Sequence, residues 1–550
     1  MRAVSILFMV CFFLVAAVRP SSSAPTTGEE GEGEVLFGEA IILRKPVFNP
    51  SVPGYDRFPF SWLNRLHVVT RENVIRNALL FREGDPYDEE ILRETERNLR
   101  GLMFINYASV EPLDPDEKRR RVVVETHDTW STQVELSVDD EEEGGEKDDF
   151  EIRLNEINIL GFGKRIGLRY TRRGNRGGLG YVYEDPLLFG SRWNMKVEVQ
   201  GGPGDDRSHD AYLRRPFYSL RTRWGGVART IRVESVRDLY RADRRIGDLF
   251  RVYRWESVAV GRMLGDRRRK FLFRFEGTRE EKVYRDLRLL EGVDSDTVAA
   301  PENERRWIGG VGLGYGSFHF IEEHQIDHFD RVEDVELGGY LYLSAGRVVE
   351  GEGEWRFAGQ GQYTHPTGSG RYLAWIAGTR ADRLSGGWGR TLAYGSILSH
   401  QRWSRRNTLA ARIRWDELWR ADPGEQFLLD HLNGLRGFGS ASGAGVRRLV
   451  INVENRFFSS IRFYTLAFGA AFFFDAGATW DRRDAVRAED IRSSFGAGLR
   501  VGLTKSRNSN VFRVDVAKNL EDGSLSAHVG LGQIFSLASP FTDFTNDPSP

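Results

Sequence analysis

The chain has 550 residues, and its 78 lysine and arginine residues nearly balance its 79 aspartate and glutamate residues. The formal net charge of −1 gives no indication of a polyanionic partner such as nucleic acid. The mean hydropathy of −0.44, with no long apolar run after the N-terminus, excludes a helical membrane protein. It does not exclude a β-barrel, because lumen-facing and lipid-facing side chains alternate along each strand.

The N-terminus has the pattern of a secretory signal peptide. Arg2 precedes a mostly apolar run at 4–18, and small or polar residues follow up to Ala24. This run is too short to span a membrane, so we expect residues 1–24 to be removed. The single cysteine, Cys11, lies inside this segment, which leaves the mature chain without a thiol for a disulfide, a nucleophile or a metal ligand. Residues 25–34 form a linker rich in glycine and glutamate.

Residues 35–128 show the pattern of a compact α/β domain. Apolar residues at helical spacing predict two helices, separated by Gly84 and Pro86, and alternation predicts three strands. The predicted elements, in chain order, are a strand at 35–47, a helix after residue 70, a helix at 88–100, and strands at 104–110 and 121–126.

From residue 129 onward, apolar and polar residues alternate with a period of two, which is typical of strands with one apolar face. Clear examples are 193–200, 271–276, 409–416 and 495–502. A soluble β-sandwich alternates as well, but the signal peptide and the aromatic residues that flank the strands favour a barrel with a polar lumen. Residues 129–536 are therefore predicted to form a mainly β, transmembrane antiparallel barrel.

The length of this region predicts about sixteen strands, at roughly 25 residues for a strand with its share of connections. Tight turns are expected between many of the strands. Longer polar stretches, expected as the loops of one rim, lie at 139–149, 281–304, 321–334 and 421–434.

Two alternating strands and one loop stand out near the C-terminus. Apolar residues occupy every second position from Leu466 to Trp480, and the positions between them are small or polar except Phe473. If the apolar faces of these strands contact lipid, Asp475 points into the lumen of the barrel. Glu454, on the preceding strand, does so as well. Arg436 lies in a glycine-flanked loop that can fold inward, and a buried guanidinium needs a carboxylate partner.

These residues carry a family resemblance. The segment Leu435-Arg436-Gly437-Phe438 resembles the Arg-Gly-Phe/Tyr loop motif of the BamA/TamA-type outer-membrane proteins, the POTRA-plus-barrel or surface antigen superfamily. The segment 473–477 resembles the Phe-x-Asp-x-Gly strand motif of that family. Either motif alone is an ordinary turn. The two motifs together, in the order in which the family has them, carry the resemblance. It implies a lumenal loop-locking motif composed of Arg436, Gly437, Phe438, Glu454, Asp475 and Gly477.

The same resemblance extends to both ends of the mature chain. The order of elements in residues 35–128 resembles one POTRA domain, which in this family faces the periplasm and docks clients along a sheet edge; a passive spacer is the alternative. Residues 525–535 are predicted to form the last strand and resemble the C-terminal β-signal of outer-membrane barrels, with Val529, Leu531, Gly532 and Phe535 as its residues. Residues 537–550 extend beyond the point where the family usually stops.

Other clusters give weaker patterns. The acidic run at 139–143, with Asp148 and Asp149, lacks the spacing of a calcium loop and is predicted to be solvated. His319, His324 and His328 lack the fixed spacing of a zinc site. A Gly-x-Ser-x-Gly elbow is absent from the sequence. We therefore expect neither an enzyme nor a bound metal or cofactor.

The resemblance implies a bacterial outer-membrane barrel that inserts or translocates polypeptides, with the POTRA domain in the periplasm. Its partners would be the outer-membrane lipid bilayer and unfolded or nascent polypeptide clients, with periplasmic accessory proteins left open and nucleic acid excluded. Two alternatives are a dedicated transporter that secretes a single partner, which usually has two POTRA domains, and a passive pore or lipid-handling barrel.

Overall fold

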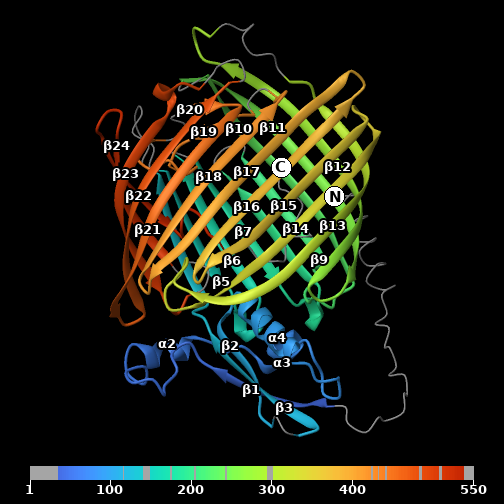
Figure 1. Ribbon diagram of the computed structural model, residues 1–550. Helices are drawn as coiled ribbons and strands as arrows, with labels where there is room; N and C mark the ends of the chain where they lie inside the picture. Colours follow the sequence, from blue (N-terminus) through green and yellow to red (C-terminus); the bar gives the residue numbers. More distant parts are fainter. Residues whose placement is uncertain are drawn as a thin grey trace.

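The computed structural model describes residues 35–537 apart from several short segments. The segments outside the description are 115–116, 140–148, 174–175, 203–205, 242–243, 294–300, 423–424, 432, 440–442, 482–485 and 507–510. The predicted signal peptide, the linker, most of the acidic run and almost all of the C-terminal extension thus lie outside the described residues. The rest forms a small α/β unit beneath a large β-barrel (Figure 1).

The small unit is a three-stranded sheet covered by helices. Its sheet order is β1-β3-β2, with β1 parallel and β2 antiparallel to β3. Ile75, Leu92 and Leu99 from the helices pack on Phe37 and Val122 of the sheet in one buried core. The elements are β1 (Leu36–Lys45), α2 (Phe60–Leu66), α3 (Glu72–Ala78), α4 (Glu89–Gly101), β2 (Ile105–Pro112) and β3 (Arg119–Asp128).

The predicted β-α-α-β-β order is therefore incomplete, because α2 is an additional helix between β1 and α3. The sequence gives little sign of it, since α2 has only seven residues and Pro46, Pro50, Pro53 and Pro59 precede it. Packing of Phe60 against Phe48 holds this short helix, as tertiary contacts do for helices too short to be stable alone.

The barrel is an antiparallel sheet whose described strands number twenty, in ring order from β4 to β25. They are β4 (Thr132–Asp139), β5 (Asp149–Glu156), β6 (Arg165–Arg173), β7 (Arg176–Asp185), β8 (Asn194–Gly201), β9 (Arg207–Arg215), β10 (Trp224–Arg241), β11 (Arg244–Gly265), β12 (Arg269–Leu289), β13 (Glu304–His324), β14 (Val332–Glu350), β15 (Trp355–Gly368), β16 (Arg371–Leu384), β17 (Gly387–Ser404), β18 (Asn407–Trp419), β21 (Arg447–Phe463), β22 (Leu466–Trp480), β23 (Arg492–Leu503), β24 (Val511–Asn519) and β25 (Leu525–Leu531). The fold class is confirmed, and the predicted count of about sixteen strands is too low.

Unequal strand lengths explain the difference in count. The first six strands, β4 to β9, have only 8–10 residues, whereas β10 to β14 have 18–22. One average length per strand therefore underestimates their number. The stretches 281–304 and 321–334 are also partly strand, since β12, β13 and β14 extend into them with charged side chains. The connection at 325–331 lies at the rim that faces the small unit, which corrects its placement among the loops of the other rim.

Alternation along the strands separates an apolar exterior from a polar lumen. On β12, Phe271, Phe273 and Phe275 are exposed outside, while Arg274 is buried inside. Exposed aromatic residues mark both ends of the wall, as in barrels that span a bilayer. Those at the strand ends near the small unit are Trp224, Trp403 and Tyr464, and those at the opposite ends are Trp307, Trp355 and Trp388.

None of the helices in the described part of the chain is long and apolar enough to cross a membrane.

The first and last strands of the barrel meet differently from the others. Nineteen neighbouring pairs have extended antiparallel registers, some of them interrupted by a bulge. β25 is the ring neighbour of β4. Within the described residues, however, this pair has no extended register of that kind. The β4–β25 seam is therefore the least paired part of the wall.

The small unit docks on one rim of the barrel, with α4 directly beneath the barrel (Figure 1). The Arg100 guanidinium donates to Asp334 (2.6 Å) and Glu322 (2.7 Å) of the β13–β14 hairpin. Asp88, whose side chain caps the N-terminus of α4, accepts from Arg221 (2.6 Å) and Arg267 (3.0 Å) of two other turns. Ion pairs from one helix thus reach three hairpins of this rim.

Candidate functional site

The connection between β18 and β21 folds into the barrel lumen. It contains the two-stranded hairpin β19 (Phe427–Leu429) and β20 (Gly443–Gly445), and Leu435 and Phe438 are buried with Leu429 of this hairpin. Gly437 has a φ of +91°, and a Cβ there would lie 2.9 Å from the Cβ of Ser494 on β23. Glycine is thus required at this position both for backbone conformation and for close approach to the wall.

Arg436, at the tip of this loop, is fully buried between two strands of the barrel wall. Its Nε and Nη2 donate to Asp475 on β22 at 2.7 and 2.9 Å, and its Nη1 donates to Glu454 on β21 at 2.8 Å. Both carboxylates are also fully buried. Burial alone would lower the pKa of Arg436, but the hydrogen bonds and charges of these acids outweigh it and raise that pKa. The guanidinium therefore stays charged and locked to the wall.

Neighbouring polar groups complete the lock. Asn452 Nδ2 bridges the Gly434 carbonyl oxygen (2.6 Å) and Asp475 Oδ1 (2.7 Å), and the Ser494 hydroxyl donates to the Arg436 carbonyl oxygen. A buried carboxylate is stabilised only when all its hydrogen-bonding capacity is used. The loop backbone and the Arg436 side chain are thus fixed by the same strands.

Phe473, the one residue that breaks the polar side of β22 in the sequence, belongs to the site. It faces the lumen, and the Arg436 guanidinium carbon lies 3.4 Å from the centroid of its ring. Cation–π contacts of this kind favour a flat, desolvated guanidinium. The exception to the alternation was the signal in the sequence that pointed to this role.

The structure brings together the six residues predicted as the loop-locking motif. Arg436, Glu454 and Asp475 are in direct contact, and Gly437 and Phe438 follow Arg436 on the buried loop tip. Gly477 lies further along β22, where an added Cβ would be 2.9 Å from Leu429 of the β19 strand. Its missing side chain lets the hairpin pack directly against the wall.

Charges extend from the lock along the lumen. Glu454 also accepts from Arg456 (2.9 Å) and Arg500 (3.2 Å), and Arg500 donates to Asp515 at 2.6 Å. These groups lie on β21, β23 and β24 and are all nearly or fully buried. A period of two puts Arg456 and Arg500 on the polar faces of their strands, but it does not connect them, because residues far apart in the chain meet only when the barrel curls.

The C-terminal segment departs from the predicted strand. β25 ends at Leu531, Gly532 turns the chain with a φ of +75°, and Phe535 lies buried inside the barrel instead of on the outer wall. Val529 and Leu531 do lie on the strand and are exposed on the outside. The prediction that the strand reaches Phe535 is therefore wrong, because Phe535 finds a more complete burial in the lumen.

Arg456 and Asp327 hold this inward segment. Arg456 Nη2 donates to the Phe535 carbonyl oxygen (2.8 Å), and its Nη1 donates to Asp327 in the β13–β14 connection (2.5 Å). Asp327 in turn accepts from the backbone N–H of Leu537 (3.1 Å) and from the Ser536 hydroxyl. Through Arg456 and Glu454, the C-terminal segment and the Arg436 loop belong to one network.

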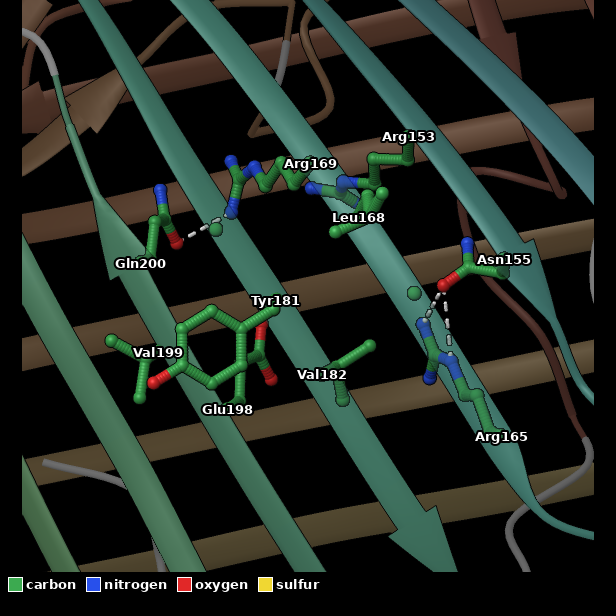
Figure 2. Close-up of a pocket in the computed structure, with 12 residues that line it drawn as sticks. Arg153, Asn155, Arg165, Leu168, Arg169, Tyr181, Val182, Glu198, Val199 and Gln200 are labelled. Carbon is green, nitrogen blue, oxygen red and sulfur yellow. Dashed lines mark hydrogen bonds between the residues drawn. The ribbon is translucent and has the colours of Figure 1, made fainter.

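The barrel also contains cavities. One of about 510 Å³ is bounded by the wall from β11 to β18 and by Phe427 of the inward hairpin. A smaller one of about 90 Å³ lies along β5 to β8 (Figure 2). There Arg165 donates to Asn155 Oδ1 at 2.9 Å, and Arg169 donates to Gln200 at 2.5 Å. These arginines are already engaged by the protein, so the smaller cavity gives no reason to expect a ligand.

Comparisons with known proteins find similarity only at the level of structure. None of the protein-family models and none of the curated proteins matches the sequence. Among solved structures, CdiB from Escherichia coli aligns with a TM-score of 0.44 at 10% identity over 96% of this chain and 98% of that one. CdiB from Acinetobacter baumannii gives 0.43 at 11% over 91% and 74%. BamA from Haemophilus ducreyi lacking POTRA domains 1–3 gives 0.36 at 10% over 90% and 83%.

Proposed function

We propose that this protein is an outer-membrane barrel that inserts or translocates polypeptides, with the α/β unit as a POTRA-like docking domain in the periplasm. The observation that carries the proposal is the Arg436 lock, in which a loop is held inside the lumen by two buried carboxylates of the wall. The same residues carry the sequence resemblance to the BamA/TamA-type proteins.

The segments that occupy the lumen argue against a passive pore. The loop between β18 and β21 and the C-terminal segment both occupy the interior, and the small unit lies across one rim. A passive pore needs a continuous aqueous path, as wide barrels with an open lumen provide. A barrel that acts on polypeptides needs instead a place where a strand can pair.

Two places in the described residues offer strand edges. The seam between β4 and β25 lacks an extended register in the described residues, so opening this seam would expose backbone N–H and C=O groups of both strands to an incoming chain. In the small unit, β1 and β2 are the outer strands of the sheet. Pairing at an edge uses backbone hydrogen bonds and therefore tolerates clients of varied sequence.

Site-specific photo-crosslinking in living cells tests this proposal. A photoreactive residue is placed at Val134 on β4 or at Val529 on β25, both exposed at the seam, and in a control at Leu313, which is equally exposed on β13. We expect unfolded or nascent polypeptides to be captured from the two seam positions and not from Leu313. Capture of lipid alone from all three positions would contradict the proposal.

A further inference from the structure

Residues 46–68 form an insert between β1 and α3, and one side of it is fixed to the protein. Phe60 of α2 is buried, with its ring centroid 4.8 Å from Phe48, 4.9 Å from Tyr55 and 5.3 Å from Tyr464 of the β21–β22 turn. Asn64 Nδ2 donates to the Phe48 carbonyl oxygen at 2.7 Å. The insert is therefore held in one orientation against the end of the barrel wall.

The other side of α2 is an apolar stripe that no other described residue covers. Phe58, Trp62 and Leu66 are 81%, 51% and 60% exposed. They are spaced four residues apart, which places Trp62 and Leu66 on one helix face, while Phe58 precedes Pro59, the N-cap residue of the helix. Three large apolar side chains in contiguous exposure are uncommon on a surface that faces only water.

The stripe is continuous with the apolar exterior of the barrel. Tyr464, which contacts Phe60, is 64% exposed, and Phe463 and Ile461 at the same end of β21 are exposed to a similar degree. Figure 1 shows α2 just below the barrel end that includes β21. The aromatic residues of this end lie where a barrel wall meets the lipid headgroups.

The charges of the insert also suit a lipid surface. The exposed residues Arg57 and Arg65 flank the stripe, and Asp56 is the one acidic residue of 46–68. Arginine beside an apolar helix face lets the side chains enter the headgroup boundary while the guanidinium meets lipid phosphates.

We propose that the segment 46–68 is a membrane-interface anchor, whose stripe Phe58-Trp62-Leu66 inserts into the phospholipid leaflet that borders the small unit. The anchor would fix the small unit relative to the membrane as well as to the barrel. This inference requires only that the barrel span a bilayer, and it holds whether or not the protein acts on polypeptides.

Depth-dependent fluorescence quenching tests the anchor in the full chain. In a Cys11→Ser background, Leu66→Cys carries an environment-sensitive nitrobenzoxadiazole (NBD) label, and the protein is reconstituted into phosphatidylethanolamine–phosphatidylglycerol vesicles. Leu313→Cys on the barrel wall is the positive control, and its quenching by doxyl lipids establishes insertion in every sample. Leu113→Cys, exposed after the far end of β2, is the solvent control.

We expect doxyl lipids to quench the Leu66 label as they quench the Leu313 label. Iodide should quench the Leu66 label at least roughly twofold less than the Leu113 label, as for side chains at the headgroup boundary. Quenching of the Leu66 label equal to that at Leu113 would overturn the proposal. So would protection from iodide without quenching by lipid, because a protein surface would then cover the stripe.

A second set of variants separates the stripe from the fold of the insert. The label is moved to Val68→Cys, and Phe58→Ser and Trp62→Ser are introduced together. The buried Phe60 is retained, so the insert should keep its fold. Removal of the stripe should then abolish quenching of the label by doxyl lipids. The matched change Tyr107→Ser, at an exposed aromatic residue of β2, should leave that quenching unchanged. Unchanged quenching in the Phe58→Ser/Trp62→Ser protein would show that the stripe is not the anchor.

Discussion

Arg436 forms ion pairs with two fully buried carboxylates of the wall, so its side chain determines whether the inward loop can stay in the lumen. In Arg436→Ala, Asp475 and Glu454 lose this partner, and removing one member of a buried ion pair costs about 3–5 kcal/mol. We expect the loop tip to leave the wall, faster amide hydrogen exchange at 434–438, and loss of polypeptide capture at the seam.

One variant shows whether the charge of Arg436 is sufficient without its geometry, and a second variant, at an exposed ion pair, is the control. Arg436→Lys keeps the charge, but an ammonium group lacks the planar fork that reaches Asp475 twice and Glu454 once, so most of the loss should remain. Arg245→Ala removes an exposed ion pair with Asp238 and should cost less than about 1 kcal/mol, with no effect on the loop. Hydrogen exchange in Arg436→Ala that matches the unsubstituted protein would refute the lock.

At the scale of elements, the C-terminal segment 532–537 is the second segment that occupies the lumen, after the loop between β18 and β21. Phe535 and Leu537 pack on Ile326, Tyr372 and Leu398 inside the wall. A chain that ends at Gly532 should therefore open space near the small unit, and we expect a higher single-channel conductance in planar bilayers. A chain that ends at Leu537 retains every described contact of the segment and is the matched control; equal conductance in both proteins would contradict this prediction.

The elements also show what the sequence predicts and what it does not. Alternation along β21 and β22 identified Glu454 and Asp475 as lumenal, because a period of two fixes the face of each side chain once one face is lipid. It did not find α2, whose seven residues depend on tertiary packing, or the inward turn at Gly532. Arg456 contacts Asp327 and Phe535, which both lie more than 70 residues away in the chain. Such contacts have no local sequence pattern.

For the whole molecule, the small unit and the barrel form one assembly, and ion pairs of α4 supply part of the contact between them. Arg100 joins Glu322 and Asp334, and Arg267 joins Asp88 and Glu90, so two arginines connect the helix to separate hairpins of the rim. Hydrogen bonds between charged groups each contribute roughly 1.5–3 kcal/mol when partly buried. Their loss should loosen the docking of the small unit without unfolding either part.

We therefore expect the double variant Arg100→Ala/Arg267→Ala to accelerate amide hydrogen exchange in α4 and in the 266–268 and 325–331 turns, while exchange in the β21–β22 pair stays slow. Arg93→Ala is the matched control, because Arg93 lies on the same helix and its one ion pair with a described residue is with Glu89, one turn away at the surface. It should leave exchange at the rim unchanged. If the double variant behaves as Arg93→Ala does, the contacts that it retains carry the docking, among them the Arg221–Asp88 pair, the hydrogen bond from Asn98 to the Tyr218 carbonyl oxygen and the packing of Phe60 against Tyr464.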